Sequence, residues 1–224
     1  MKERNSMKIT TVIFDLDGTL LDTLGDLTDA VNYALTAYEM PQRSIDEIRQ
    51  FVGNGIRRLM QRAVPNGEKN PDFEAVFSTF RSYYDVHCND KTKPYEGIME
   101  LIDALKERNT RLAIVSNKVD SAVQTLNKRY FPQIAVAVGD REELRRKPAP
   151  DSVFTAMNAL GAKRAETLYV GDSEVDIETA QNAGIKCASV LWGFRNREQL
   201  TKSGAQILLE QPFELLEILD HEII

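Results

Sequence analysis

The chain has 224 residues, of which 42% are hydrophobic and 28% charged, and its net charge is −6. This size is enough to bury one large core, or a main domain with an inserted second module. The negative charge argues against a general nucleic-acid binder, because such proteins carry a basic surface that neutralises phosphates. A small anionic partner stays possible, because a local positive pocket can form on an acidic protein.

The two cysteines, Cys88 and Cys187, are too few for a disulfide framework and have no metal-site spacing. We therefore expect reduced thiols in a cytoplasmic protein. The apolar run at residues 9–14 is too short for a signal peptide and is followed at once by Asp15. Because no stretch approaches the roughly 20 apolar residues of a membrane span, we expect a soluble protein without a membrane partner.

Short apolar runs alternate with helical patterns along most of the chain. The predicted strands are residues 11–14, 111–115, 134–138, 167–170, 187–191 and 206–209. Helical patterns lie at 98–105, 153–160 and 175–183, the last closed by Gly184. This alternation predicts an α/β fold, a Rossmann-like parallel sheet with helices on both faces. In such a sheet the ligand site lies at the carboxyl ends of the strands.

One segment interrupts the alternation. Residues 25–89 carry helical spacing without a strand candidate, broken at Pro41, at 65–67 and at 70–71. We predict an inserted four-helix domain over residues 22–92, with residues 1–21 and 93–224 forming the Rossmann-like core. Residues 21–24 and 90–95 are interpreted as tethers between the two.

The sequence Asp15-Leu16-Asp17-Gly18-Thr19 follows the first predicted strand. Two carboxylates so close together would repel each other unless a divalent cation lay between them, because hard cations take oxygen ligands. Gly18 permits a positive φ, so that the chain can turn sharply and leave both acids at the sheet edge. An acidic turn without function is the alternative for this motif alone.

A second acidic motif, Gly171-Asp172-Ser173 with Asp176, follows the strand at 167–170. Asp172 ends its strand as Asp15 does, so both should point into the same crevice, and Asp176 lies about one helical turn further on. The alternative is that Asp172 or Ser173 simply caps the following helix. A cap alone leaves the additional acid unexplained.

Two further motifs bring polar groups to strand ends. Ser116-Asn117-Lys118 offers a hydroxyl, an amide and backbone N–H groups that could hold phosphate oxygens, although it also reads as a turn. In residues 147–150, two prolines restrict the backbone and so place the side chain of Lys147 in a defined direction. The arginines that precede it are interpreted as a solvated basic stretch. Together the four motifs predict a site for a divalent metal and a phosphoryl group.

In this order, the four motifs resemble the signature of the haloacid dehalogenase-like phosphatase superfamily. Within it the chain looks most similar to phosphoglycolate phosphatases, through 20–23 and 52–55, the 116–118 motif and 192–195. The resemblance implies that the inserted helices are a cap domain. It also implies that Asp15 is the nucleophile, that Asp17 is the general acid and base, and that Lys147 offsets charge repulsion.

The resemblance further implies ligands. Mg²⁺ is held by Asp15, by the backbone carbonyl of Asp17, by Asp172, and by Asp176 directly or through water. The phosphate-binding residues are Ser116, Asn117, Gly18 and Thr19, of which Thr19 orders the loop. In the cap, backbone amides of Gly53, Asn54 and Gly55 would meet the anionic substrate, with charge from Arg57 or Arg58. A solvated helix face is the alternative for these two arginines.

The predicted function is that of a Mg²⁺-dependent phosphatase that hydrolyses a small phosphomonoester, best 2-phosphoglycolate, through an aspartyl-phosphate. The alternatives are a β-phosphoglucomutase-like phosphomutase, an inorganic pyrophosphatase and a non-catalytic phospho-sensing module. Asp17, as a proton donor for turnover, and the large helical insert both argue against the sensor. The expected partner is a small phosphorylated metabolite, not nucleic acid, and the expected state is a monomer or homodimer.

Overall fold

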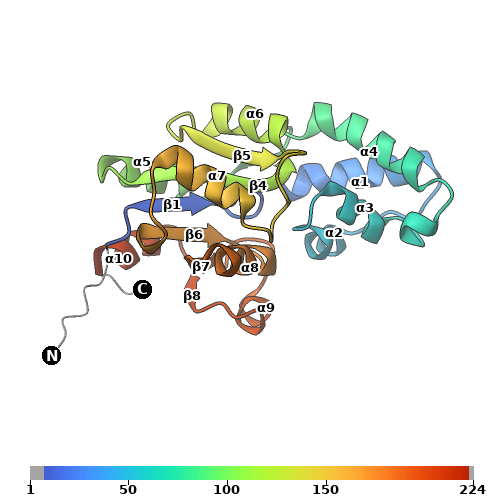
Figure 1. The fold of residues 1–224 in the computed structure, drawn as a ribbon. Helices are drawn as coiled ribbons and strands as arrows, with labels where there is room; N and C mark the ends of the chain where they lie inside the picture. Colours follow the sequence, from blue (N-terminus) through green and yellow to red (C-terminus); the bar gives the residue numbers. More distant parts are fainter. Residues whose placement is uncertain (1–7, 222–224) are drawn as a thin grey trace. The chain divides into compact units, whose positions relative to one another are not determined.

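The computed structural model of the protein describes residues 8–221, which form two units (Figure 1). The first contains the chain up to Leu20 and from Tyr95 onward, and the second is Leu21–Pro94. The division falls one or two residues outside the predicted 22–92 segment. The physical reason is that the two predicted tethers pair with each other and so belong to the second unit.

The first unit contains a parallel sheet that has six strands in the described residues. They are β1 (Thr11–Phe14), β4 (Arg111–Val119), β5 (Val136–Asp140), β6 (Thr167–Gly171), β7 (Lys186–Val190) and β8 (Ile207–Leu209). Their order is β5-β4-β1-β6-β7-β8, and each neighbouring pair is parallel. This confirms the predicted Rossmann-like α/β fold.

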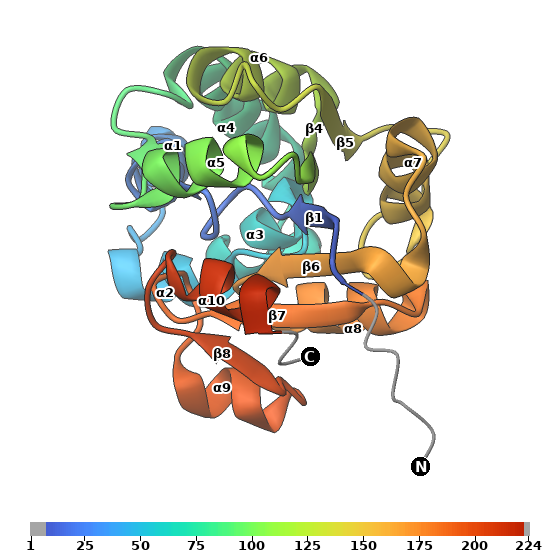
Figure 2. The same ribbon diagram turned by 90° about the vertical axis from the view of Figure 1, so that its left-hand side faces the viewer.

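Helices cover both faces of this sheet, which explains the continuous apolar runs of its central strands. The helices are α5 (Ile98–Glu107), α6 (Asp120–Tyr130), α7 (Asp151–Leu160), α8 (Glu174–Ala183), α9 (Arg197–Lys202) and α10 (Glu214–His221), with the short 3-10 helix η2 (Arg164–Glu166). Helices α7 and α8 lie on one side of the sheet and α5 on the other (Figures 1 and 2). The sequence prediction missed α6, which buries few apolar side chains, among them Val123 and Leu126.

The strand order decides where a ligand site can form. Strand β1 lies at the centre of the sheet, with β4 on one side and β6 on the other. The chain builds outward from β1 through β4 to β5 and then returns to β6, so the strand order reverses between β1 and β6. Open α/β sheets bind ligands outside the carboxyl ends of their strands at such a point. Asp15 follows β1 and Asp172 follows β6.

The second unit is helical, as predicted, with four α-helices between Leu21 and Pro94, all within the described residues. They are α1 (Leu24–Ala37), α2 (Ile45–Phe51), α3 (Ile56–Ala63) and α4 (Phe73–His87), with a 3-10 helix η1 (Gly67–Lys69). The predicted tethers are in part strands: β2 (Leu21–Asp22) pairs antiparallel with β3 (Lys93–Pro94), and Leu24 already belongs to α1. Two residues a side are too short for a periodic pattern, so the sequence carried no signal for this pairing.

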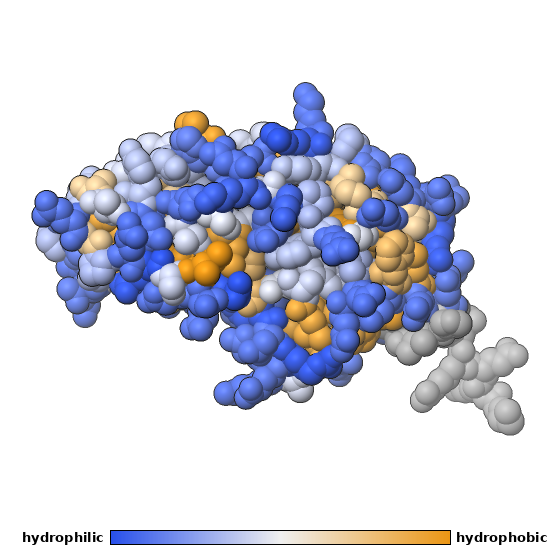
Figure 3. Space-filling view, turned by 180° about the vertical axis from the view of Figure 1, so that it is seen from behind, coloured by the Kyte–Doolittle hydropathy of each residue, from blue (hydrophilic) through white to orange (hydrophobic). Residues whose placement is uncertain are grey.

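The surface shown in Figure 3 is largely hydrophilic, and its hydrophobic residues appear in separate patches. Most large apolar side chains are instead buried, such as Phe14 in the sheet and Phe80 in the helical unit. Between residues 8 and 221, none of the helices combines the length and the apolar character needed to cross a membrane.

Candidate active site

The turn after β1 lies in close contact with the end of β6. The backbone N–H of Asp15 donates to the carbonyl of Val170 on β6 at 2.9 Å, which anchors the turn to the neighbouring strand. Leu16 is fully buried beneath it. Gly18 has φ +85°, and a Cβ there would lie 2.3 Å from Asp172 Oδ2. A glycine is therefore required both by the backbone conformation and by the space available.

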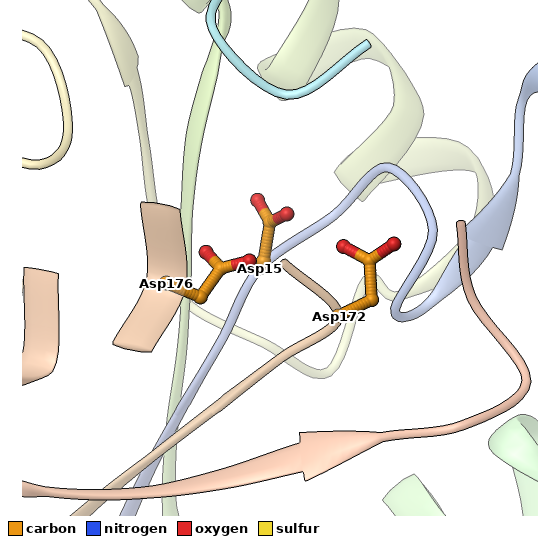
Figure 4. Close-up of side chains that lie close together, drawn as sticks. All are labelled: Asp15, Asp172 and Asp176. Atoms are coloured by element: carbon orange, nitrogen blue, oxygen red, sulfur yellow. The ribbon is translucent and has the colours of Figure 1, made fainter. Parts of the chain in front are cut away.

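Three buried carboxylates meet at the switch point of the sheet (Figure 4). Asp15, Asp172 and Asp176 each offer an oxygen, and these atoms lie within 4.8 Å of one another, the one such acidic trio that the described residues provide. Their exposed fractions are 7%, 1% and 0%. Buried carboxylates this close require compensating positive charge or bound protons. The donor set is all oxygen, so the trio fits a hard divalent cation.

Lys147 supplies part of that charge. Its ammonium lies 2.8 Å from Asp15 Oδ1 and 2.8 Å from Asp176 Oδ1, and it is 5% exposed. Asn117 fixes the lysine backbone: Asn117 Nδ2 donates to the Lys147 carbonyl at 3.1 Å, and the Lys147 N–H donates to Asn117 Oδ1 at 2.9 Å. The side chain of Asn117 therefore positions Lys147, a role that the sequence did not reveal.

Tyr169 is a site residue that the sequence analysis missed. It is fully buried on β6, where its hydroxyl accepts from Lys147 Nζ at 3.0 Å and donates to Asp176 Oδ1 at 3.1 Å. The available signal was a single hydroxyl in the otherwise apolar run 168–170. Tyr169 thus holds the lysine and the carboxylate in one hydrogen-bonded group.

The second acidic motif both caps a helix and contributes to the candidate site. Ser173 is the N-cap of α8, and its N–H and Oγ donate to Asp176 Oδ2 at 3.1 and 2.6 Å. Asp176 therefore completes a capping box with one oxygen and contacts Lys147 with the other. Asp172 takes no part in the cap.

Asp17 is paired with a buried cation. Its carboxylate accepts from Lys118 Nζ at 3.1 Å, and that lysine is 6% exposed. Ser116 is buried beside this pair, and its Oγ accepts from the Lys118 N–H at 3.2 Å. Thr19 is fully buried, and its carbonyl accepts from Trp192 Nε1. The structure thus gathers the predicted residues of the first unit around the β1–β6 switch point.

The predicted specificity residues of the second unit are held by contacts of their own. Arg62 donates to the Phe51 carbonyl at 2.7 Å and to Asn54 Oδ1 at 3.1 Å, and so fixes the loop that contains Gly53 and Gly55. Arg57 is paired with two carboxylates, Glu68 at 2.8 Å and Glu74 at 2.6 Å. Arg58 donates to Gln61. A substrate role for Arg57 would require it to leave these partners.

Burial is the largest influence on the pKa values of Asp15 and Asp172. It raises the pKa of Asp15 to about 7, against the opposing pull of Lys147. Burial and the neighbouring Asp176 raise the pKa of Asp172 well above its usual range. Burial alone would lower the pKa of Lys147, but Asp15 and Asp176 raise it well above its ordinary value. The metal-free site therefore retains protons that a bound cation would displace.

This protonation predicts a pH-dependent metal affinity. Asp15 binds a cation as the carboxylate, so below about pH 7 protons compete with the metal. We expect the apparent affinity to weaken about tenfold per pH unit for each displaced proton. Calorimetry at about pH 5.5 and about pH 8, in buffers that differ in ionisation enthalpy, measures the apparent metal affinity and the number of displaced protons. Equal affinities at both pH values would contradict the prediction.

The same shift affects stability without metal. An unfolded aspartate loses its proton near 3.8, whereas folded Asp15 keeps it to about 7. Between these values the folded state binds more protons, so the contribution of Asp15 to stability falls as the pH rises through this interval.

Comparison with known proteins identifies the family. The family model described as haloacid dehalogenase-like hydrolase matches residues 12–190. An N-acetylmuramic acid 6-phosphate phosphatase of Pseudomonas aeruginosa is 30% identical over 220 residues, with 97% of each chain covered. A phosphoglycolate phosphatase of Aquifex aeolicus is 31% identical, covering 95% of this chain and 98% of its own length.

A solved structure from Lactobacillus delbrueckii subsp. bulgaricus, provisionally named a phosphoglycolate phosphatase, agrees with this assignment. Its TM-score is 0.91 at 35% identity, with 95% of this chain and 99% of the other covered. These similarities span both the sheet and the helical insert, and they confirm the resemblance drawn from the four motifs. The chain belongs to the haloacid dehalogenase-like hydrolase family.

Proposed function

We propose that this chain is a Mg²⁺-dependent phosphatase that hydrolyses a small phosphomonoester through an aspartyl-phosphate on Asp15, with 2-phosphoglycolate as the preferred substrate. The observation that carries the proposal is the meeting of Asp15, Asp172 and Asp176 with the Lys147 ammonium at the switch point of the sheet. The relatives, named as phosphatases, support the same reaction class.

In the first step a carboxylate oxygen of Asp15 attacks phosphorus, and the bond from phosphorus to the ester oxygen breaks. Bound at the trio, Mg²⁺ would offset the negative charge of the phosphoryl oxygens and of the nucleophile. Lys147 serves the same purpose from the protein side and holds Asp15 in one orientation. Ser116 and the backbone N–H of Asn117 would hold phosphoryl oxygens.

Asp17 moves the proton in both steps of the proposed reaction. It protonates the departing ester oxygen, then accepts a proton from the water that attacks phosphorus and releases phosphate from Asp15. Lys118, at 3.1 Å from Asp17 Oδ1, supports this role by holding the carboxylate in place. The proposal accordingly uses two carboxylates of one turn for two different tasks.

A substrate panel tests the reaction class and the substrate together. Phosphate release is measured with Mg²⁺ for 2-phosphoglycolate, N-acetylmuramic acid 6-phosphate, pyrophosphate and β-glucose 1-phosphate. We expect the highest kcat/KM for 2-phosphoglycolate and loss of activity on chelation. Preference for another phosphomonoester would replace the substrate assignment, and isomerisation of the glucose phosphate would indicate a mutase. No turnover of any compound would reject the proposed function.

The role of Asp17 predicts a dependence on the leaving group. Asp17→Asn removes the proton donor, so hydrolysis of an alkyl phosphate should fall by roughly 10²–10⁴-fold. p-Nitrophenyl phosphate has a leaving group that departs without a proton, so its first step should be much less affected. Single-turnover rates on both substrates test this prediction. An equal loss on both would show that Asp17 does not act as the general acid.

A further inference from the structure

The loop between β7 and α9 contacts both turns that carry the acidic motifs. Trp192 Nε1 donates to the carbonyl of Thr19, in the turn after β1, at 2.9 Å. Two residues later, the N–H of Phe194 donates to Asp172 Oδ2, after β6, at 2.7 Å. One short segment, which we call the 192–195 clasp, therefore connects two stretches of chain that are more than 150 residues apart.

The clasp fits against these turns without spare room. A Cβ on Gly193 would lie 2.3 Å from the Gly18 carbonyl oxygen and 2.4 Å from Asp172 Cβ. A Cβ on Gly18 would in turn lie 2.8 Å from a ring carbon of Phe194. Two glycines thus allow the three segments to touch.

The last residue of the clasp carries a buried positive charge. Arg195 is 6% exposed and binds Glu174 with two hydrogen bonds, Nε to Oε2 at 2.8 Å and Nη2 to Oε1 at 3.1 Å. Glu174 is the first residue of α8, directly beyond Asp172 and Ser173. The ion pair therefore ties the end of the clasp to the start of the helix that carries Asp176.

We propose that the 192–195 clasp, with Trp192 as its anchor, is a positioning element that preorganises Asp172 and the Gly18–Thr19 turn for the divalent cation. The inference deepens the proposed function and rests on it for the identity of the cation. The N–H of Phe194 donates to Asp172 Oδ2 and so orients the carboxylate, whose other oxygen can serve as a ligand. Partners that orient ligands in this way govern metal affinity although they do not touch the metal.

Trp192→Phe tests the anchor, because it keeps an aromatic ring and removes the N–H that reaches Thr19. Mg²⁺ binding is measured by calorimetry on the purified chain, together with Tm in the absence of metal. We expect about tenfold weaker binding, the lower end of effects on such partners. Gln124→Met is the matched control, since Gln124 Nε2 makes a similar bond to the carbonyl of Ala137 at 2.8 Å outside the acidic trio.

Gly193→Ala provides a second test, because its methyl group pushes directly on Asp172 and Gly18. It should weaken Mg²⁺ binding more than Trp192→Phe does. The positioning role is rejected if the folded variants bind Mg²⁺ as the unmodified chain does, even where Tm falls. Calorimetry requires no substrate, so the outcome stays separate from a failure of the proposed phosphatase activity.

Trp192 is the single tryptophan of the sequence, so its fluorescence offers a further check. Emission of the unmodified chain should change with Mg²⁺ along the calorimetric curve.

Discussion

Asp15→Asn should lower the rate of phosphate release by roughly 10⁴-fold or more, the scale seen when a nucleophile is removed. The amide cannot form the aspartyl-phosphate, and it also removes one oxygen anion from the acidic trio. Folding should not suffer, since burial already disfavours the ionised form of Asp15 and raises its pKa to about 7. We expect Tm of the metal-free variant to be unchanged or higher at about pH 8.

The measurement is steady-state phosphate release with saturating Mg²⁺, together with thermal unfolding of the same samples. Asp103→Asn is a suitable control, because it makes the same chemical change at an exposed position on α5. Retention of wild-type turnover by Asp15→Asn would remove the aspartyl-phosphate from the mechanism. A large fall in Tm would instead attribute the loss of activity to unfolding.

Lys147→Met should impair both activity and stability. Loss of the ammonium leaves Asp15 and Asp176 without their nearest positive charge, so the rate should fall by roughly 10²–10³-fold. Removal of one member of a buried ion pair costs about 3–5 kcal/mol of folding free energy. The cost should be smaller at about pH 5 than at about pH 8, because Asp15 can then keep its proton.

Urea unfolding of the metal-free protein at both pH values tests the stability effect. Lys163→Met is the control: Lys163 has an exposed side chain and pairs with Glu166 at 3.4 Å, so its loss should change little. A destabilisation that is the same at both pH values would mean that the acids do not depend on Lys147 for charge compensation.

Much of the fold could be predicted, because local patterns carry it. Strand β1 was predicted with its observed bounds, since four apolar or β-branched residues end abruptly at Asp15. The stop at Gly184 was also predictable, since the residue adopts the left-handed conformation with φ +68°. The β2–β3 pair and helix α6 were not predicted. The strands are too short to show a periodic pattern, and the apolar residues of α6 are sparse.

Within the candidate site, the residue types and the motif order came from the sequence, whereas their pairing did not. Lys118 was recognised as part of a motif, but its partner Asp17 lies 101 residues away. The sequence assigned no contact to Tyr169 or Trp192, because a hydroxyl or an indole N–H acquires a role only when a partner is placed opposite it. No local pattern encodes such a partner.

The sequence by itself determined an α/β chain with acids, a lysine and a hydroxyl at strand ends, because periodicity and turn residues act over a few positions. Only the tertiary structure decided that β1 lies between β4 and β6, and hence that Asp15, Asp172 and Asp176 share one point with Lys147. It also decided that Asp17 is paired with Lys118 and that a loop after β7 donates a backbone N–H to Asp172. These contacts depend on strand order and close packing across the whole sheet, which are long-range properties of the folded chain.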